Sequence, residues 1–343
     1  MLTGRHSQSR VAGILVAGFC LFLLFLHRRE NTYPETGETV DHSIIPGDAV
    51  GVHTTQAHAT PRRETEIVLA STTKEDPSWV YRYFPHWNPQ VYITDDPLAP
   101  LTVPKNKGHE AMVYLTYIID HYDNLPDIAI FAHASRFQWH NDDPDYDIFP
   151  TLRNFRLPYV REAGYVNLRC VWVIGCPAEI RPFDDEEPEA FNDEEQREGA
   201  AKKPVSAKGV FRRAFQELLP EVPVPTLVAV SCCSQFAVTR DTIQRHSKER
   251  YVRFRDWLLD TPLEDSLSGR VMEFSWHIIF GKEAYHCPSA KECYCKVFGL
   301  CDLACSDSSC DGRYILPPYA TLPEGWPKLG WEHEDRGYIE PSY

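Results

Sequence analysis

The stretch from Asn106 to Asp143 constrains the fold of this chain more than any other part of the sequence. Its first half places apolar residues at steps of three and four, which is the spacing of one buried helix face. These residues are Ala111, Tyr114, Leu115, Ile118, Ile119 and Tyr122. Turn residues at 124–127 end the pattern, and the apolar run Ile128–Ala132 then has the length of a buried strand. The sequence therefore predicts a core helix followed closely by a core strand.

Polar side chains gather directly after this strand. His133, His140, Asp142 and Asp143 are of the types that bind a divalent cation or assist proton transfer. In open α/β sheets, ligands bind beyond the carboxyl ends of the strands. We therefore expect these four residues to hold Mn²⁺ or Mg²⁺ on a diphosphate. The alternative is a polar loop whose histidines cap backbone groups.

Further short segments predict the rest of the sheet. Strands are expected at Ile67–Ala70, Val91–Ile93, Asn167–Ile174, Thr226–Val230 and Phe236–Val238. Helices are expected at Val210–Leu219, after an N-cap at Thr239, and at Val271–Phe280. Strands that alternate with helices predict an α/β fold with a mostly parallel sheet flanked by helices.

Two places suit the phosphates of a donor substrate. Asn106 and Gly108 precede the predicted helix, where free N–H groups favour an anion, although Glu110 in the first turn partly opposes this. Glu110 would otherwise only stabilise the helix dipole. Asp95 and Asp96 form a second acidic pair after a strand, although Asp-Asp-Pro is also a common turn sequence.

Glu273 and His277 lie four positions apart in the predicted helix 271–280. That spacing places both side chains on one helix face and suits an acid/base pair or two metal ligands. We expect them to act on the hydroxyl group of an acceptor substrate, with Glu273 as the general base that removes its proton. A structural contact between the two side chains in the core is the other interpretation.

The amino-terminal region predicts attachment to a membrane. Val11–Leu26 is apolar throughout and is flanked by arginines, and no small-residue cleavage pattern follows it. We interpret 1–10 as cytoplasmic, 11–27 as an uncleaved signal anchor, and 28–65 as a flexible stem. The luminal domain would span 66–316, with an acidic loop at 184–203 and a tail at 317–343.

The cysteines indicate an oxidising compartment. Six of the 11 cysteines crowd into 287–310, and their spacing lacks the paired knuckles of a zinc site. Disulfides in the endoplasmic reticulum, in the Golgi lumen or outside the cell are therefore expected, with Cys170, Cys176, Cys232 and Cys233 available for further pairs.

Charge and motifs exclude several classes of function. A net charge of -14 argues against a nucleic-acid partner, because phosphate binding needs a surplus of Lys and Arg on one face. The sequence contains no Gly-x-Ser-x-Gly, phosphate loop, His-Glu-x-x-His or dinucleotide fingerprint. These absences disfavour hydrolases, kinases, zincins and dehydrogenases.

Several segments together carry a family resemblance. NKGHEAMVYL, YDNLPDIAIFAHASRFQWHNDD, SQFAVTRDTI, EFSWHIIFG and CPSAKECYCKVFGLC resemble the fungal proteins grouped as domain of unknown function 3431, across most of Ile67–Cys310. The Asn-x-Gly-x-Glu run and the strand that ends in histidine are more distantly similar to rhamnan-synthesis-type glycosyltransferases. This chain has His109 and Glu110 where that pattern has Arg and Asp, and it has no Asp-x-Asp in the expected strand.

The distant resemblance implies a fold of the nucleotide-diphospho-sugar transferase type and a sugar-transfer activity on a small-molecule or glycan acceptor. The missing Asp-x-Asp favours a second interpretation, a non-catalytic luminal binding or accessory protein, for example of a secondary-metabolite pathway.

Overall fold

The computed structural model describes residues 63–143, 146–172, 174–184 and 207–301. The predicted anchor, the stem up to residue 62, residues 185–203 of the acidic loop, Cys305, Cys310 and the tail all lie outside these ranges. No helix within the described ranges is long and apolar enough to cross a bilayer.

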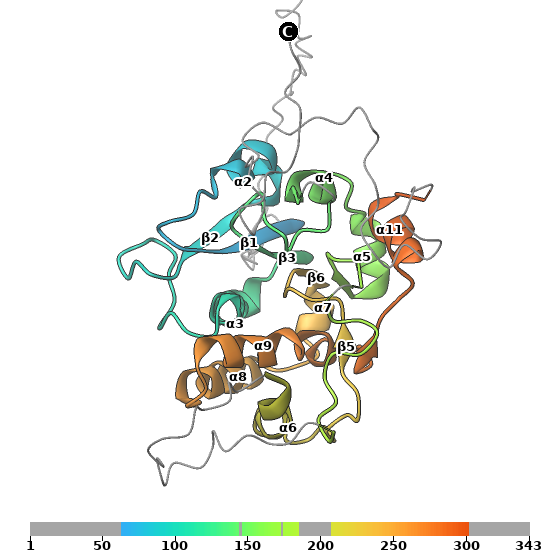
Figure 1. The fold of residues 1–343 in the computed structure, drawn as a ribbon. Helices are drawn as coiled ribbons and strands as arrows, with labels where there is room; N and C mark the ends of the chain where they lie inside the picture. The colour runs from blue at the N-terminus through green and yellow to red at the C-terminus, as the bar shows by residue number, and fades with distance from the viewer. Residues whose placement is uncertain (1–62, 144–145, 173, 185–206, 302–343) are drawn as a thin grey trace, which may run out of the picture. The chain divides into compact units, whose positions relative to one another are not determined.

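A five-stranded sheet forms the centre of the described region, in the order β2 (Gln90–Ile93), β1 (Thr65–Ser71), β3 (Ile128–His133), β6 (Phe236–Thr239) and β4 (Tyr165–Asn167) (Figure 1). β1 runs parallel to both of its neighbours, with Leu69 opposite Val91 and Ala132. β6 is antiparallel to β3 and β4, with Phe131 opposite Phe236. The sheet is therefore mostly parallel, as predicted, with one reversed strand between β3 and β4.

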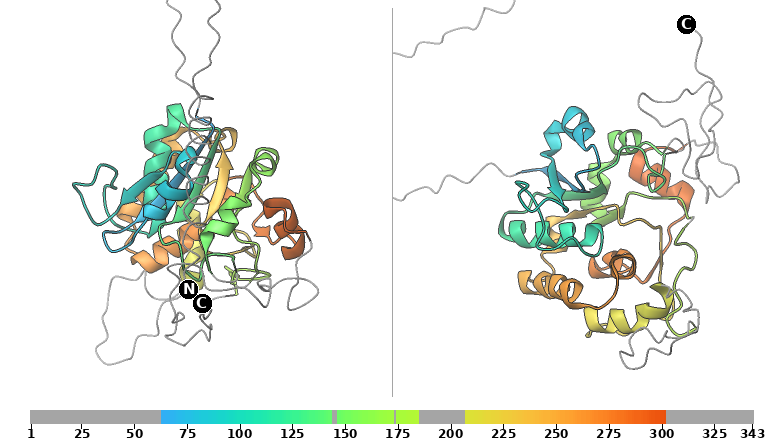
Figure 2. Two further views of the ribbon diagram at one scale, coloured as in Figure 1. Left: turned by 90° about the horizontal axis from the view of Figure 1, so that it is seen from above. Right: turned by 60° about the vertical axis from the view of Figure 1, so that its left-hand side comes forward.

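Helices cover both faces of this sheet (Figure 2). One layer consists of α3 (Glu110–His121), α6 (Ala207–Leu218), α8 (Lys248–Asp260), α9 (Asp265–Glu273) and α10 (Trp276–Ile279). The other contains α2 (Ser78–Tyr83), η1 (Pro85–Trp87), α4 (Ile148–Arg153), α5 (Leu157–Ala163) and α11 (Ala290–Phe298). The alternation of a strand explains the two layers, because Val68 packs into the first core while Ile67 and Leu69 pack into the second.

The core helix and the core strand predicted between residues 106 and 132 are confirmed. α3 spans Glu110–His121 and buries residues 111–119, and the short η2 (Tyr122–Asn124) follows it. Its Tyr114 ring packs 4.8 Å from the Phe131 ring of β3. The apolar face of the helix thus packs against the strand that follows it in sequence.

The expected strand 167–174 is wrong beyond Asn167, where β4 ends. The Asn167 side chain accepts a hydrogen bond from Arg169 N at 2.8 Å, and Asp142 accepts hydrogen bonds from Cys170 N and Val171 N. Side chains therefore satisfy the backbone donors that a strand would have paired.

The expected helix 271–280 is also wrong as a single element. α9 ends at Glu273 and α10 begins at Trp276. At the break, the Ser275 hydroxyl donates to Val271 O at 2.7 Å, and this hydrogen bond competes with the regular helical pattern. Glu273 and His277 consequently do not share a helix.

Two other expected elements are shorter or divided. The strand 226–230 is only β5 (Ala229–Val230), which pairs with β7 (Tyr285–His286) outside the main sheet. Thr239 is an N-cap as predicted, and its hydroxyl accepts from Thr242 N, but the helix it starts is the short α7 (Arg240–Ile243) that precedes α8.

Disulfides confirm the prediction from cysteine usage. Cys170–Cys293 and Cys176–Cys287, which we call the clamp disulfides, join the loops after β4 to α11 and to the segment after β7. Cys295–Cys301 closes a local loop at the end of α11. The fourth disulfide joins the neighbours Cys232 and Cys233.

Candidate functional site

The carboxyl ends of β1 and β3 mark the place where an α/β sheet of this order binds ligands. From β1 the sheet continues to β2 on one side and to β3 on the other, which makes the β1–β3 pair the switch point of the strand order. β6 runs the other way, so the residues just before it reach the same edge. This edge therefore collects side chains from the segments that follow β1, β2 and β3 and from the segment that precedes β6.

Glu75 and Ser135 meet beyond β1 and β3. The Glu75 carboxylate accepts hydrogen bonds from the Ser135 hydroxyl at 3.0 Å and from Thr72 N at 2.9 Å. We call these three residues, with Thr73, the β1–β3 crevice. Sequence reasoning missed this contact, because nothing local shows that the ends of β1 and β3 lie side by side.

The acidic pair after β2 forms a turn. Asp95 accepts hydrogen bonds from Thr73 N and from the Thr73 hydroxyl, both at 2.8 Å, and these bonds lower the pKa of its carboxyl. Asp96 accepts from Leu98 N at 2.9 Å. Asp95 thus joins the end of β2 to the β1–β3 crevice, and Asp96 caps the turn behind it.

His133 and His140 lie together at the end of β3. Their rings are 4.7 Å apart. The His133 Nε2 atom is 2.9 Å from Cys233 O, and His133 N donates to the Gln235 side chain at 3.1 Å. His140 Nδ1 lies 3.1 Å from the Gln138 side-chain oxygen. The two histidines therefore belong to one hydrogen-bonded group with the chain segment that enters β6.

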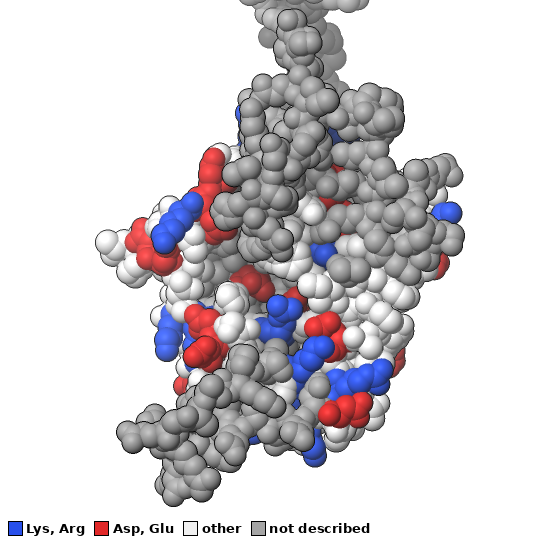
Figure 3. Space-filling view, in the orientation of Figure 1, with Lys and Arg blue, Asp and Glu red and all other residues white. Residues whose placement is uncertain are grey.

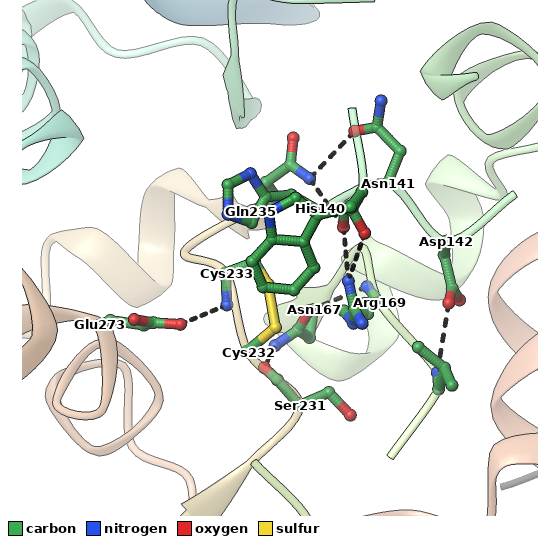
Figure 4. The surroundings of a disulfide bond; sticks show 12 residues. His140, Asn141, Asp142, Asn167, Arg169, Ser231, Cys232, Cys233, Gln235 and Glu273 are labelled. Atoms are coloured by element: carbon green, nitrogen blue, oxygen red, sulfur yellow. Dashed lines mark hydrogen bonds between the residues drawn. A yellow bond between two sulfur atoms is a disulfide. The ribbon is translucent and has the colours of Figure 1, made fainter. Parts of the chain in front are cut away.

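Asp142 and Asp143 are both buried. The Asp142 carboxylate accepts a hydrogen bond from Cys170 N at 2.8 Å (Figure 4). It also accepts one from the Tyr294 hydroxyl at 3.1 Å. Asp143 is 5% exposed, and its carbonyl accepts from Tyr146 N. The four residues predicted to bind a cation do not converge as ligands in this arrangement, and the divalent cation stays a prediction.

The turn Ser231–Ser234, which we call the cystine turn, faces this group from the β6 side. Its centre is the Cys232–Cys233 disulfide, and both cysteines are buried. Cys233 and Ser234 have φ angles of 91° and 50°, a region that non-glycine residues seldom adopt. Adjacent positive-φ residues that are held by a covalent ring indicate a fixed backbone shape at the edge of the sheet.

The Glu273 carboxylate accepts a hydrogen bond from the backbone of this turn. Cys233 N donates to the Glu273 carboxylate at 2.5 Å, and Figure 4 shows the side chain directed at the turn from α9. Burial raises the pKa of the Glu273 carboxyl, and the negative charge of Glu110 raises this pKa further. The Arg270 guanidinium, 3.2 Å away, and His133 act in the opposite direction without reversing the shift. The structure thus brings Glu110, His133 and Glu273 into one electrostatic group.

Protein atoms crowd the start of α3, where phosphate binding was expected. Gly108 has a φ of +71°, and a Cβ atom there would lie 2.5 Å from a Leu258 methyl carbon. Gly269 of α9 is packed equally closely against His109. Asn106 is exposed on the outside of this contact. The glycine therefore permits close helix packing, and α9 covers the helix start.

His277 lies apart from Glu273. Its Nε2 atom is 3.1 Å from Ala284 O, and its ring is stacked on the His286 ring. Burial lowers the pKa of His277 to about 3. These contacts fit a neutral core histidine.

Charged side chains of both signs are interspersed on the face shown in Figure 3, and neither sign forms a continuous field there. The absence of a nucleic-acid partner, expected from the net charge, stays a prediction.

Residues 67–296 match the family model described as protein of unknown function (DUF3431). The chain belongs to this family. The match includes all five strands of the main sheet except the first two residues of β1, and it also includes the cystine turn and Glu273. Neither a curated protein nor a solved structure gives a significant match to the chain.

Proposed function

We propose that this protein transfers a sugar from a nucleotide-sugar donor to a hydroxyl group of a small-molecule or glycan acceptor. The donor diphosphate would occupy the β1–β3 crevice, and Glu273 would remove the proton from the acceptor hydroxyl. The helix 11–27 would anchor the enzyme in the membrane, with the domain in the lumen of the endoplasmic reticulum or Golgi, or outside the cell.

The Glu273 carboxyl, whose side chain is 12% exposed, is the observation that carries this proposal. Its pKa is raised by burial, and it lies at the edge of the sheet where α/β proteins bind their substrates. A general base is most effective when its pKa approaches the working pH. Burial and the charge of Glu110 both move the pKa of Glu273 in this direction.

The β1–β3 crevice supplies groups that suit a phosphate or a sugar. Thr72, Thr73 and Ser135 carry hydroxyls, and His133 offers a ring at the same edge. Each hydroxyl is at once a donor and an acceptor. The Asn106, Gly108 and Glu110 region would contribute to the donor site only through Glu110, because α9 covers the helix start.

A luminal binding or accessory protein is the second candidate, and a specific observation favours it. Many polar groups at this edge already bond one another, as in Glu75 with Ser135 and Asp95 with Thr73. A substrate would have to replace these hydrogen bonds with its own. A silent member of the family would retain them.

Thermal unfolding of the full chain with a panel of nucleotide sugars, each with and without Mn²⁺, tests the proposal. A ligand that binds only the folded state raises the unfolding temperature by mass action. We expect one nucleotide to produce a shift, and Ser135→Ala to reduce it. Ser266→Ala on the exposed side of α9 is the matched control. A flat panel with a well-folded protein would favour the accessory function.

A further inference from the structure

A cavity of about 110 Å³ lies along the outer edge of β4, away from the β1–β3 crevice. Its walls come from α5, α11, β4 and the β5–β7 pair, and they include Tyr165, Ser231, Lys282 and His286. Ser231 begins the cystine turn, so the cavity and Glu273 lie beside different residues of that turn (Figure 4). The proposed sugar transfer makes no use of this cavity.

Basic side chains outnumber acidic ones in its lining. Arg169, Lys282 and Lys296 face it, whereas Glu292 is the only carboxylate in the wall. Lys296 forms an ion pair with Glu292 one helical turn away on α11. Lys282 then supplies positive charge beside the empty space, whereas the Arg169 guanidinium donates to Trp139 O at 3.1 Å and to His140 O at 2.9 Å.

The Lys282 ammonium has spare hydrogen-bonding capacity. Its single described hydrogen bond runs to Ala163 O at 2.8 Å, and an ammonium can donate three. Burial lowers the pKa of Lys282, and the charge of Arg245 lowers it further. A negative group in the cavity would oppose both effects and would accept the remaining donors.

Two neutral side chains add selectivity to this charge. Tyr165 is 3% exposed and lines the cavity. Burial lowers the pKa of His286 to about 4, so its ring is neutral at pH 7 and can donate through one nitrogen. A tyrosine hydroxyl beside the cavity can likewise donate one hydrogen bond to a bound acceptor.

We propose that this cavity binds a small oxyanion, the carboxylate or phosphate group of a small molecule, with Lys282 as its charged partner and Tyr165 and His286 as neutral donors. The size of the cavity fits such a headgroup, and a larger remainder of the ligand would extend through the open side. The site is separate from the proposed sugar-transfer site and does not depend on it.

Thermal unfolding and calorimetric titration of the full chain with sodium phosphate and with sodium acetate, at an ionic strength matched by sodium chloride, test the site. We expect at least one of the two anions to raise the unfolding temperature above the chloride control. Lys282→Met should weaken binding by roughly 10-fold or more, because a charge-assisted hydrogen bond is lost. Tyr165→Phe retains the ring and should weaken binding by a few-fold, and it serves if Lys282→Met fails to fold.

Lys248→Met is the matched control, because Lys248, the first residue of α8, pairs with Asp123 of η2 and does not line the cavity. A shift with acetate alone identifies a carboxylate ligand, a shift with phosphate alone identifies a phosphate ligand, and shifts with both identify shared oxyanion chemistry. Equal unfolding temperatures in all three salts would overturn the proposal. Binding that survives both Lys282→Met and Tyr165→Phe unchanged would overturn it as well.

Discussion

The clamp disulfides join residues 123 and 111 positions apart, whereas the cystine turn joins neighbours. A crosslink between distant residues restricts the unfolded chain strongly, and one between neighbours restricts it very little. The clamp therefore serves stability, while the cystine turn fixes the shape of a few backbone atoms next to Glu273. The comparison shows that one covalent bond can have two different roles, set by its place in the sequence.

The largest effect is expected from removing one clamp disulfide. The Cys170→Ala, Cys293→Ala double variant should lose about 3 kcal/mol of unfolding free energy, because Cys176–Cys287 still closes the long loop and the lost disulfide restricts only the ring formed by residues 170–176 and 287–293. Urea denaturation measures this change. A loss below about 1 kcal/mol would show that the clamp resembles the turn and would break the comparison.

Glu273→Gln tests the turn side of the comparison. Glutamine retains the acceptor for Cys233 N but cannot take up a proton, so turnover should fall about 100-fold or more while the domain stays folded. In the unsubstituted protein, the proposed transferase activity should be lost as the pH falls through the raised pKa of Glu273, because the base is then protonated. The measurements are kcat/KM against pH for both forms, and full activity of the variant would remove Glu273 from the mechanism.

The His277→Gln variant tests how the stability of the region beside the clamp disulfides depends on pH. His277 stacks on His286, the residue before Cys287, and its pKa is lowered from 6.5 to about 3. The unfolded state therefore binds the proton first, and the stability present above pH 6.5 is lost as the pH falls toward 3. At pH 5 this loss is roughly 2 kcal/mol for one such histidine.

Urea denaturation at pH 7 and pH 5 gives the comparison. The His277→Gln variant should lose less stability between these two pH values than the original protein does. His86→Gln, at an exposed position, should leave the pH dependence unchanged. Identical pH dependence in all three proteins would contradict the assignment of a buried neutral His277.

The smallest change in stability is expected from the Cys232→Ala, Cys233→Ala double variant. Its unfolding free energy should stay within about 1 kcal/mol of the original, because the crosslink closes almost no loop. Turnover should nevertheless fall, because the turn no longer fixes the Cys233 N–H that Glu273 accepts. A variant that is much less stable but fully active would reverse the roles that we assign to the clamp and the turn.

The sequence predicted the parts of the fold that depend on local pattern. The spacing in α3 and the apolar run of β3 determine those elements without reference to the rest of the chain. The reversed direction of β6 was not predictable in this way, because it depends on pairing with β3 about a hundred residues earlier. The end of β4 was missed because a side chain from another loop, Asp142, bonds the backbone that follows it.

The candidate site was predicted in its residues more than in their arrangement. Glu273 and His133 lie in one electrostatic group, whereas Asp142 satisfies backbone donors and His277 lies elsewhere. Residue type shows what a side chain can do, but burial and neighbours decide which of those roles remains. The pairing of Cys232 with Cys233, rather than with a distant cysteine, likewise follows from positions that only the folded chain defines.

The place of β6 between β3 and β4 has a consequence for how the protein is made. A ribosome releases β1, β2, β3 and β4 well before residues 236–239, so the nascent chain holds an incomplete sheet with the edge of β3 unpaired. Unpaired strand edges are where growing chains aggregate. The sheet can close only after roughly two thirds of the sequence has been synthesised. Until then, the helices already formed and chaperones must protect the unpaired edge of β3.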